Sequence, residues 1–143
     1  MRQIKFRGRR ANVQWIYGDL VRQEDTILGD ITCCVFPAQA YDSYDNYIVD
    51  QQTVGQYTNR KDKHGVEIYE GDIVKTKCNV GVVRYNAKHW FYEVASPDES
   101  LGNERIPAGV PEEDWEVLGN IHDNPELLDI VGYYATPEEE KND

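Results

Sequence analysis

Carboxylates are the most abundant groups in this sequence that could perform chemistry, since Asp and Glu together number 26. Glu67, Glu70 and Asp72 are close neighbours around a glycine, and residues 112–114 form an acidic run. Two carboxylates held close together can share a proton or bind a divalent cation. Aspartates in turns also accept backbone hydrogen bonds. We therefore expect these acids to be structural, with a metal-using enzyme as the alternative.

The histidines and the known catalytic motifs offer no second route to chemistry. His64, His89 and His122 are not spaced from any Cys, Asp or Glu in the way that zinc ligands are. The sequence lacks a glycine-rich phosphate loop, a nucleophile elbow and the His-Glu-x-x-His motif. We therefore predict a protein that is not an enzyme and that has no catalytic residue, metal site or cofactor.

The formal net charge of −11 disfavours nucleic-acid binding, because phosphate backbones are bound through Lys and Arg. One basic stretch departs from this balance. The alternative function is nucleic-acid binding, in which the contacts would be Lys5, Arg7, Arg9 and Arg10. In the competing interpretation these cations alternate on the solvated face of an edge strand. A further alternative is that the acidic surface mimics DNA and inhibits a host DNA-binding protein.

Aromatic side chains supply the candidate contacts for a protein partner. The chain contains 10 tyrosines, and rings with a polar tip suit half-buried sheet faces and interfaces. The predicted contact residues are Tyr41, Tyr44, Tyr47, Trp90 and Tyr92. For the polar loop at 38–46, the alternative is that its tyrosines fold onto the sheet.

Cysteine usage indicates a reducing compartment. Cys33, Cys34 and Cys78 are odd in number and two of them are adjacent, so they do not resemble a disulfide framework. No signal peptide opens the sequence, and its apolar runs are too short to span a membrane. We expect a cytoplasmic protein in which Cys33 and Cys34 behave as small hydrophobic strand residues.

Short strands must position these side chains, because apolar and polar residues alternate along much of the chain. Residues 3–9 and 14–21 predict an antiparallel pair. Further strands are predicted at 26–28, 31–36, 47–50, 73–78, 81–85, 89–95 and 115–121. Regular spacing and turns that contain Gly or Asn favour a mainly β protein with a small antiparallel β-barrel.

Two turns organise the middle of the chain. Asp62-Lys63-His64-Gly65 has the composition of a hairpin turn, in which the aspartate accepts backbone hydrogen bonds and the glycine takes the left-handed conformation. Glu70-Gly71-Asp72 forms the next corner, and Gly71 is free to adopt a positive φ. We therefore predict that Asp62, Gly65, Gly71 and Asp72 are structural turn residues.

The C-terminal part predicts a short helix at 124–130. Asn124-Pro125-Glu126 supplies a cap, a proline for the first helical position and an acid at the positive end of the helix dipole. Residues 133–143 are acidic and predict a flexible tail. The predicted organisation is an N-terminal β region at 1–60 and a barrel-like region at 61–132 that includes this capping helix.

Three separate blocks of the sequence carry a family resemblance. The first is Ile4-Lys5-Phe6-Arg7-Gly8, and the most specific one comprises residues 53–58 and 61–74. The third comprises residues 115–128. In this order and over nearly the whole chain, the blocks resemble the YopX family of phage and prophage proteins. Asn59 and His64 stand where many members have glycine and asparagine, a change that a turn tolerates.

The resemblance implies a mainly β protein with a pseudo-barrel capped by a helix, encoded by a phage or prophage and made in the cytoplasm of a bacterial host. It also implies self-association, so the expected partners are a second copy of the chain and an unknown host or phage protein. It carries over no catalytic residue. We therefore predict a non-enzymatic accessory protein that binds another protein or itself.

Overall fold

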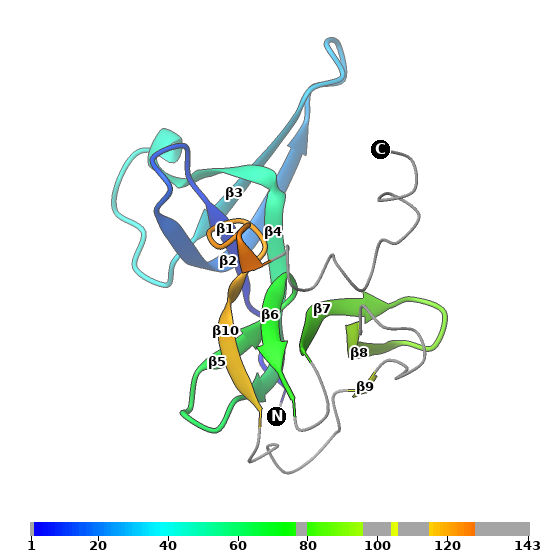
Figure 1. Cartoon of the computed structure of the whole chain (residues 1–143). Coiled ribbons are helices and arrows are strands. Elements are labelled where there is room, and N and C mark those ends of the chain that lie inside the picture. Colours follow the sequence, from blue (N-terminus) through cyan, green and yellow to red (C-terminus); the bar gives the residue numbers. More distant parts are fainter. Residues whose placement is uncertain (1, 77–79, 96–103, 106–114, 128–143) are drawn as a thin grey trace. The chain divides into compact units, whose positions relative to one another are not determined.

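The computed structural model describes residues 2–76, 80–95, 104–105 and 115–127. Their regular structure is almost entirely antiparallel β-strand, so the prediction of a mainly β protein is confirmed (Figure 1). The chain divides into two compact units, Met1–Tyr57 and Thr58–Asp143. Each unit has its own buried core.

The N-terminal unit contains four strands and one short helix. They are β1 (Phe6–Arg9), β2 (Trp15–Glu24), β3 (Ile31–Phe36), the 3-10 helix η1 (Tyr44–Tyr47) and most of β4 (Ile48–Lys61). The strands pair in a circuit: β1 with β2, β2 with β3, β3 with β4, and β4 with β1. Because β1 has neighbours on both sides, the interpretation of its cations as edge-strand residues is wrong. Alternation of apolar and polar residues shows which residues share a face of a strand, but it does not show which strands lie beside it.

The core of this unit is formed by residues of β2, β3, β4 and η1, and three consecutive residues of β3 are buried. Its buried members are Ile16, Cys33, Cys34, Val35, Tyr47 and Val49. Cys33 and Cys34 are free and buried within β3, as expected. Gly8 allows β1 to lie close to β4, since a Cβ at this position would come within 2.6 Å of Val49 Cγ2.

Strand β4 is much longer than the short strand predicted at 47–50, and its pairing with β1 is irregular. The register shifts between Arg7 and Arg9. At this point the buried Thr53 hydroxyl accepts a hydrogen bond from Arg9 N at 2.8 Å and donates one to Asp50 O at 2.6 Å. A side chain therefore satisfies backbone groups that the interrupted ladder cannot pair.

Residues 26–28 form a turn rather than the predicted strand. The Asp25 carboxylate accepts hydrogen bonds from Ile27 N at 2.8 Å and Leu28 N at 3.0 Å. The carbonyl oxygen of Asp25 accepts another from Gly29 N at 2.7 Å. An aspartate that satisfies neighbouring amides offers the backbone a local alternative to a sheet ladder. As a result, β2 and β3 form a single hairpin closed by this turn.

The C-terminal unit contains the end of β4, which pairs with β5, and a separate five-stranded sheet. After β4, the strands of this unit are β5 (Glu67–Tyr69), β6 (Asp72–Lys75), β7 (Val80–Asn86), β8 (Phe91–Ala95), β9 (Glu104–Arg105) and β10 (Glu116–Asn120). The sheet order is β10-β6-β7-β8-β9. Among the described residues no pairing joins β9 to β10, so the described strands form an open sheet and not the clear barrel predicted over 61–132. Closing a barrel requires a particular strand tilt and stagger, which alternation does not specify.

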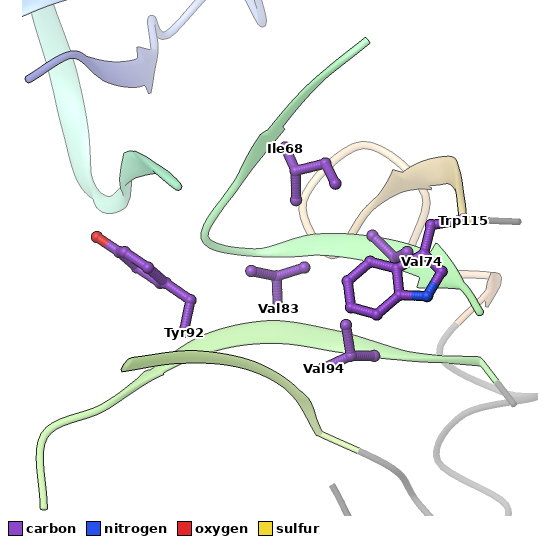
Figure 2. Packing of buried hydrophobic residues seen from close by; sticks show 6 residues of the cluster. All are labelled: Ile68, Val74, Val83, Tyr92, Val94 and Trp115. Atoms are coloured by element: carbon purple, nitrogen blue, oxygen red, sulfur yellow. The ribbon is translucent and has the colours of Figure 1, made fainter. Parts of the chain in front are cut away.

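Six buried side chains form the core of the C-terminal unit: Ile68, Val74, Val83, Tyr92, Val94 and Trp115. Figure 2 shows the Trp115 ring beside Val74 and Val94. Trp115 is only 4% exposed and comes from the residue directly before β10. Since truncating a core tryptophan costs roughly 3–5 kcal/mol, this ring is a principal anchor of β10.

Only residues 124–127 of the capping helix predicted at 124–130 are described, with residues 125–126 in a turn and Leu127 helical, so a capping helix is not shown. Leu127 N donates to Asn124 O at 2.9 Å, which makes a turn. The Asn124 side chain accepts a hydrogen bond from Asn120 N at 3.1 Å and so points back toward β10. Residues 128–130, the tail at 133–143 and Cys78 lie outside the described residues. No helix within the described ranges is long and apolar enough to cross a membrane.

Candidate protein-contact sites

The turn between β7 and β8 presents a tryptophan to solvent. Asn86 organises the turn: its side-chain oxygen accepts hydrogen bonds from Lys88 N and His89 N, both at 3.1 Å. Its carbonyl oxygen accepts a hydrogen bond from Trp90 N at 2.7 Å. The side chain of Trp90 is 81% exposed. A large apolar ring therefore sits on a turn whose backbone is well ordered by hydrogen bonds.

The backbone of Trp90 is in the left-handed region, with φ of 62°. For a bulky residue this conformation is a true outlier, and strained residues of this kind cost of order 1–3 kcal/mol. Glycine adopts it without strain. At 81% exposure the ring recovers little of this cost through packing. The stability of the turn therefore does not explain why a tryptophan occupies this position.

A buried carboxylate supports the turn from the sheet. Glu93 is 3% exposed, and its two oxygens accept hydrogen bonds from Asn86 Nδ2 at 3.0 Å and Arg84 Nε at 2.7 Å. Burying a carboxylate is unfavourable unless it is paired and hydrogen-bonded, and Glu93 is both. Since Asn86 is bonded to Glu93 at one end and to the turn at the other, the sheet holds Trp90 in position.

The N-terminal unit contains a groove of about 470 Å³. Its lining residues are Arg10, Gln14, Trp15, Ile16, Tyr17, Pro37, Asp42, Asn46 and Tyr47. Arg10 Nη1 donates to Gln14 Oε1 at 3.2 Å, and the Tyr47 hydroxyl accepts a hydrogen bond from Asp42 N at 2.9 Å. The volume is within the range of about 300–1,000 Å³ that is typical of ligand sites. Aromatic walls with one cation and one carboxylate suit binding of a mixed apolar and polar group.

Asp62 ties its own turn to a distant strand. Its carboxylate accepts hydrogen bonds from the backbone N–H groups of His64 at 2.8 Å, Val66 at 2.9 Å and Val117 at 2.9 Å. Burial opposes ionisation of this carboxyl, but the hydrogen bonds from Val117, Val66 and His64 outweigh that effect, so the pKa of Asp62 is lowered. Gly65 completes the turn with φ of 80°.

The second corner has comparable geometry. Gly71 has φ of 89°, its N–H donates to Val83 O at 2.9 Å, and its carbonyl accepts from Ile121 N at 3.0 Å. Asp72 is 2% exposed, and its carboxylate accepts a hydrogen bond from Tyr69 N at 2.7 Å. At this corner the chain thus makes backbone contacts with β7 and with the residue that follows β10.

The sequence matches a known family over most of its length. The family model described as YopX protein covers residues 5–129. The chain belongs to the YopX family. The crystal structure of protein EF1440 from Enterococcus faecalis resembles this YopX-family chain with 22% sequence identity and a TM-score of 0.49, over 90% of this chain and 99% of that chain. No curated protein matches this YopX-family chain.

The predicted contact aromatics of this YopX-family protein differ widely in exposure. Tyr41 and Trp90 are 85% and 81% exposed. Tyr92 is buried in the core of the C-terminal unit, where its ring meets Tyr85 edge-on at 5.1 Å. Tyr47 is buried in the other core and also lines the groove. Of these residues, Tyr41 and Trp90 are the ones that a partner can reach broadly.

The loop that precedes β4 in the YopX-family chain is partly folded onto the sheet. The Tyr47 ring lies 5.2 Å from that of Phe36, and the Tyr44 ring lies 6.4 Å from it. The Tyr44 hydroxyl donates to Gln23 Oε1 at 2.8 Å. Tyr44 and Tyr47 therefore fold onto the sheet, as the alternative to a contact surface predicted. Tyr41 instead projects into solvent.

The basic residues in and beside β1 do not form one exposed patch. Arg7 is only 5% exposed, and its guanidinium lies 4.7 Å from the Trp15 ring. Lys5 Nζ lies 5.2 Å from the Tyr57 ring. Arg9 is partly buried, and Arg10 lines the groove. Binding to phosphates needs several accessible cations, and the burial of Arg7 removes the central one.

The neighbouring carboxylates Glu67 and Asp72 accept hydrogen bonds from two different groups of Tyr69. Glu67 accepts a hydrogen bond from the Tyr69 hydroxyl at 3.0 Å, and Asp72 accepts from the Tyr69 amide. Within the described ranges, no three His, Cys, Asp or Glu side chains gather in a way that could hold a metal ion. These acids therefore support the corner geometry as hydrogen-bond acceptors.

Two exposed apolar residues were missed by the reasoning from sequence. Ile27 and Leu28 are 90% and 72% exposed at the tip of the β2–β3 hairpin. The alternation rule assigned them to a strand, although Asp25 followed by Gly29 is a turn signal that could have located them.

Proposed function

We propose that this YopX-family protein is a phage or prophage accessory protein that acts in the host bacterial cytoplasm by binding another protein, without catalysis. The observation that carries the proposal is Trp90, which is 81% exposed with φ of 62°. A residue that costs stability and gains little packing is best explained by an interaction outside the chain.

The chemistry of Trp90 fits a protein partner. Tryptophan is among the residues most enriched at interface hot spots, because it buries a large ring and still offers an N–H donor. The hydrogen bonds that the backbone of the turn donates to the Asn86 side chain hold the site in one conformation. A preordered contact loses less entropy on binding than a mobile one does. Tyr41, also highly exposed, is a second candidate contact.

The test is affinity capture from host cells with three versions of the tagged protein: wild type, Trp90→Gly and Lys88→Ala. Lys88 is an exposed residue of the same turn and serves as the matched control. We expect a host or phage protein that is retained by the wild type and Lys88→Ala and is depleted at least tenfold by Trp90→Gly. Identical capture by all three proteins would contradict the proposed role of Trp90.

A further inference from the structure

The first part of strand β2 has a neighbouring strand on one side only. Residues 15–18 pair with β1, and β2 begins to pair with β3 at Asp19, which lies opposite Phe36. Pro37 follows directly and ends β3, because proline has no N–H with which to continue a ladder. In the part of the chain that the structure describes, no strand pairs with residues 15–18 on the β3 side. A place for one more strand is therefore open there, roughly 13 Å long at about 3.3 Å per residue.

The groove of the N-terminal unit runs along this edge of β2. Trp15, Ile16 and Tyr17 all line it, and so does Pro37 at the end of β3. Successive side chains of a strand point to opposite faces of the sheet, so three consecutive residues line one groove where it follows the edge of the strand. The loop and the 3-10 helix before β4 supply the lining residues Asp42, Asn46 and Tyr47.

The pairing pattern shows which backbone groups of β2 face the groove. Arg9 N donates to the hydroxyl of Thr53 in β4 at 2.8 Å, so the backbone of Arg9 points away from its β2 partner, Trp15. Bonded and non-bonded pairs alternate along an antiparallel ladder, so the pair of Arg7 and Tyr17 has the same orientation. The N–H and C=O groups of Trp15 and Tyr17 therefore point away from β1, toward the groove.

We propose that the groove binds an extended segment of a different protein, which adds to the edge of β2 as an antiparallel strand. The backbone of such a segment pairs with the groups that Trp15 and Tyr17 direct to this side. Its side chains alternate between two faces, so they meet the rings of Trp15 and Tyr17 on one face and Ile16 on the other. Tyr47 lies in the same core cluster as Ile16, so apolar residues of the segment suit both faces.

The charges around the groove determine the ends of the bound segment. The charged residues that line the groove or lie within two positions of a lining residue are Arg9, Arg10, Asp19, Asp42 and Asp45. Arg9 and Arg10 precede β2, and Asp19 lies just beyond the open edge. A strand antiparallel to β2 begins beside Asp19 and ends beside Arg10, so opposite charges favour a basic residue at its start and an acidic residue at its end. Asp42 and Asp45 in the loop add to the preference for a basic residue.

The test begins with a library of random dodecapeptides selected on the full chain. We expect enriched peptides with apolar residues between a basic start and an acidic end. Fluorescence anisotropy then compares one enriched peptide on wild type and variants. Arg10→Glu and Tyr17→Ala should each weaken binding at least about tenfold. The control Tyr85→Ala should not, although Tyr85 is 43% exposed and Tyr17 is 45% exposed. Exchanging the acidic residue of the peptide for lysine should restore binding to Arg10→Glu, which shows that this variant is folded.

N-methylation of the enriched peptide tests strand pairing without changing the protein. A methyl group on the amide nitrogen removes its hydrogen-bond donor. In an added strand the residues opposite Trp15 and Tyr17 bond to β2 and the residue between them does not. N-methylation should therefore weaken binding at least about tenfold at alternate positions and less than about twofold between them.

The groove is independent of the binding role proposed for Trp90, so Trp90→Gly should bind the peptide as the wild type does. Failure at Trp90 and failure at the groove can thus be told apart. Four results would overturn the proposal for the groove. They are a library with no enriched peptide, equal binding to wild type, Arg10→Glu and Tyr17→Ala, loss of binding in Trp90→Gly, and N-methyl effects that do not alternate. Effects that repeat every third residue would indicate a polyproline II segment instead.

Discussion

The carboxylate of Asp62 accepts a hydrogen bond from the backbone N–H of Val117 at 2.9 Å, although the two residues are 55 positions apart. Beside it, Lys63 N donates to Trp115 O at 2.9 Å. The turn after β4 thus provides both an acceptor and a donor to the segment that begins β10. Trp115, a member of the core, is held at this position by the backbone of the turn.

We expect Asp62→Asn to lower the free energy of unfolding by about 1–3 kcal/mol, since an amide cannot accept three hydrogen bonds as well as a carboxylate does. Urea unfolding monitored by circular dichroism measures this change. Asp50→Asn is the matched control, because the Asp50 carboxylate accepts a local bond from Gln52 N and the residue is exposed. Equal effects of the two substitutions would contradict the long-range role of Asp62.

The same residue predicts a pH dependence of stability. The pKa of Asp62 is lowered in the folded state from its ordinary value of 3.8, because three backbone N–H groups favour the ionised form. Its stabilising contribution is therefore complete above the unfolded-state pKa and is lost as the pH falls through the lower folded-state pKa. The difference in unfolding free energy between wild type and Asp62→Asn should be constant from pH 7 to pH 5 and should shrink below about pH 4. A difference that grows on acidification would refute this linkage.

Trp90→Gly should leave the free energy of unfolding unchanged or raise it by up to about 1 kcal/mol. Glycine relieves the strain at φ of 62°, and the greater flexibility of the unfolded chain offsets part of that gain. Trp90→Ala keeps the strained backbone and should not be more stable than wild type. If thermal and urea unfolding show that Trp90→Gly is strongly destabilised, the tryptophan has a structural role, and the argument for a binding role fails.

Two glycines of the C-terminal unit should respond differently to alanine. At Gly65 the φ of 80° is unfavourable, but a Cβ would meet nothing within 4 Å, so Gly65→Ala should cost about 1 kcal/mol. At Gly81 a Cβ would lie 2.4 Å from Ala95 O, so β7 and β8 would have to move apart. We expect Gly81→Ala to cost more than Gly65→Ala in urea unfolding. The reverse order would show that β7 and β8 are less closely packed at this point.

Features that depend on neighbouring residues could be read from the sequence. Alternation located β1, β2 and β3, and the pairing of β1 with β2 follows from the short turn between them. Turn chemistry located Asp62 and Gly71, because a carboxylate and a glycine act on backbone groups only a few positions away. The error at 26–28 was also local: Asp25 satisfied the amides that a strand would have needed.

The tertiary structure alone decided which strands became neighbours and which side chains were covered. Alternation cannot show that β4 pairs with β1, or that β9 and β10 lie at opposite edges of the second sheet. For the same reason Tyr92 and Trp90, two positions apart, could not be told apart as core and surface residues. Burial is set by contacts between distant segments, whereas the sequence by itself determines the conformations that each short segment prefers.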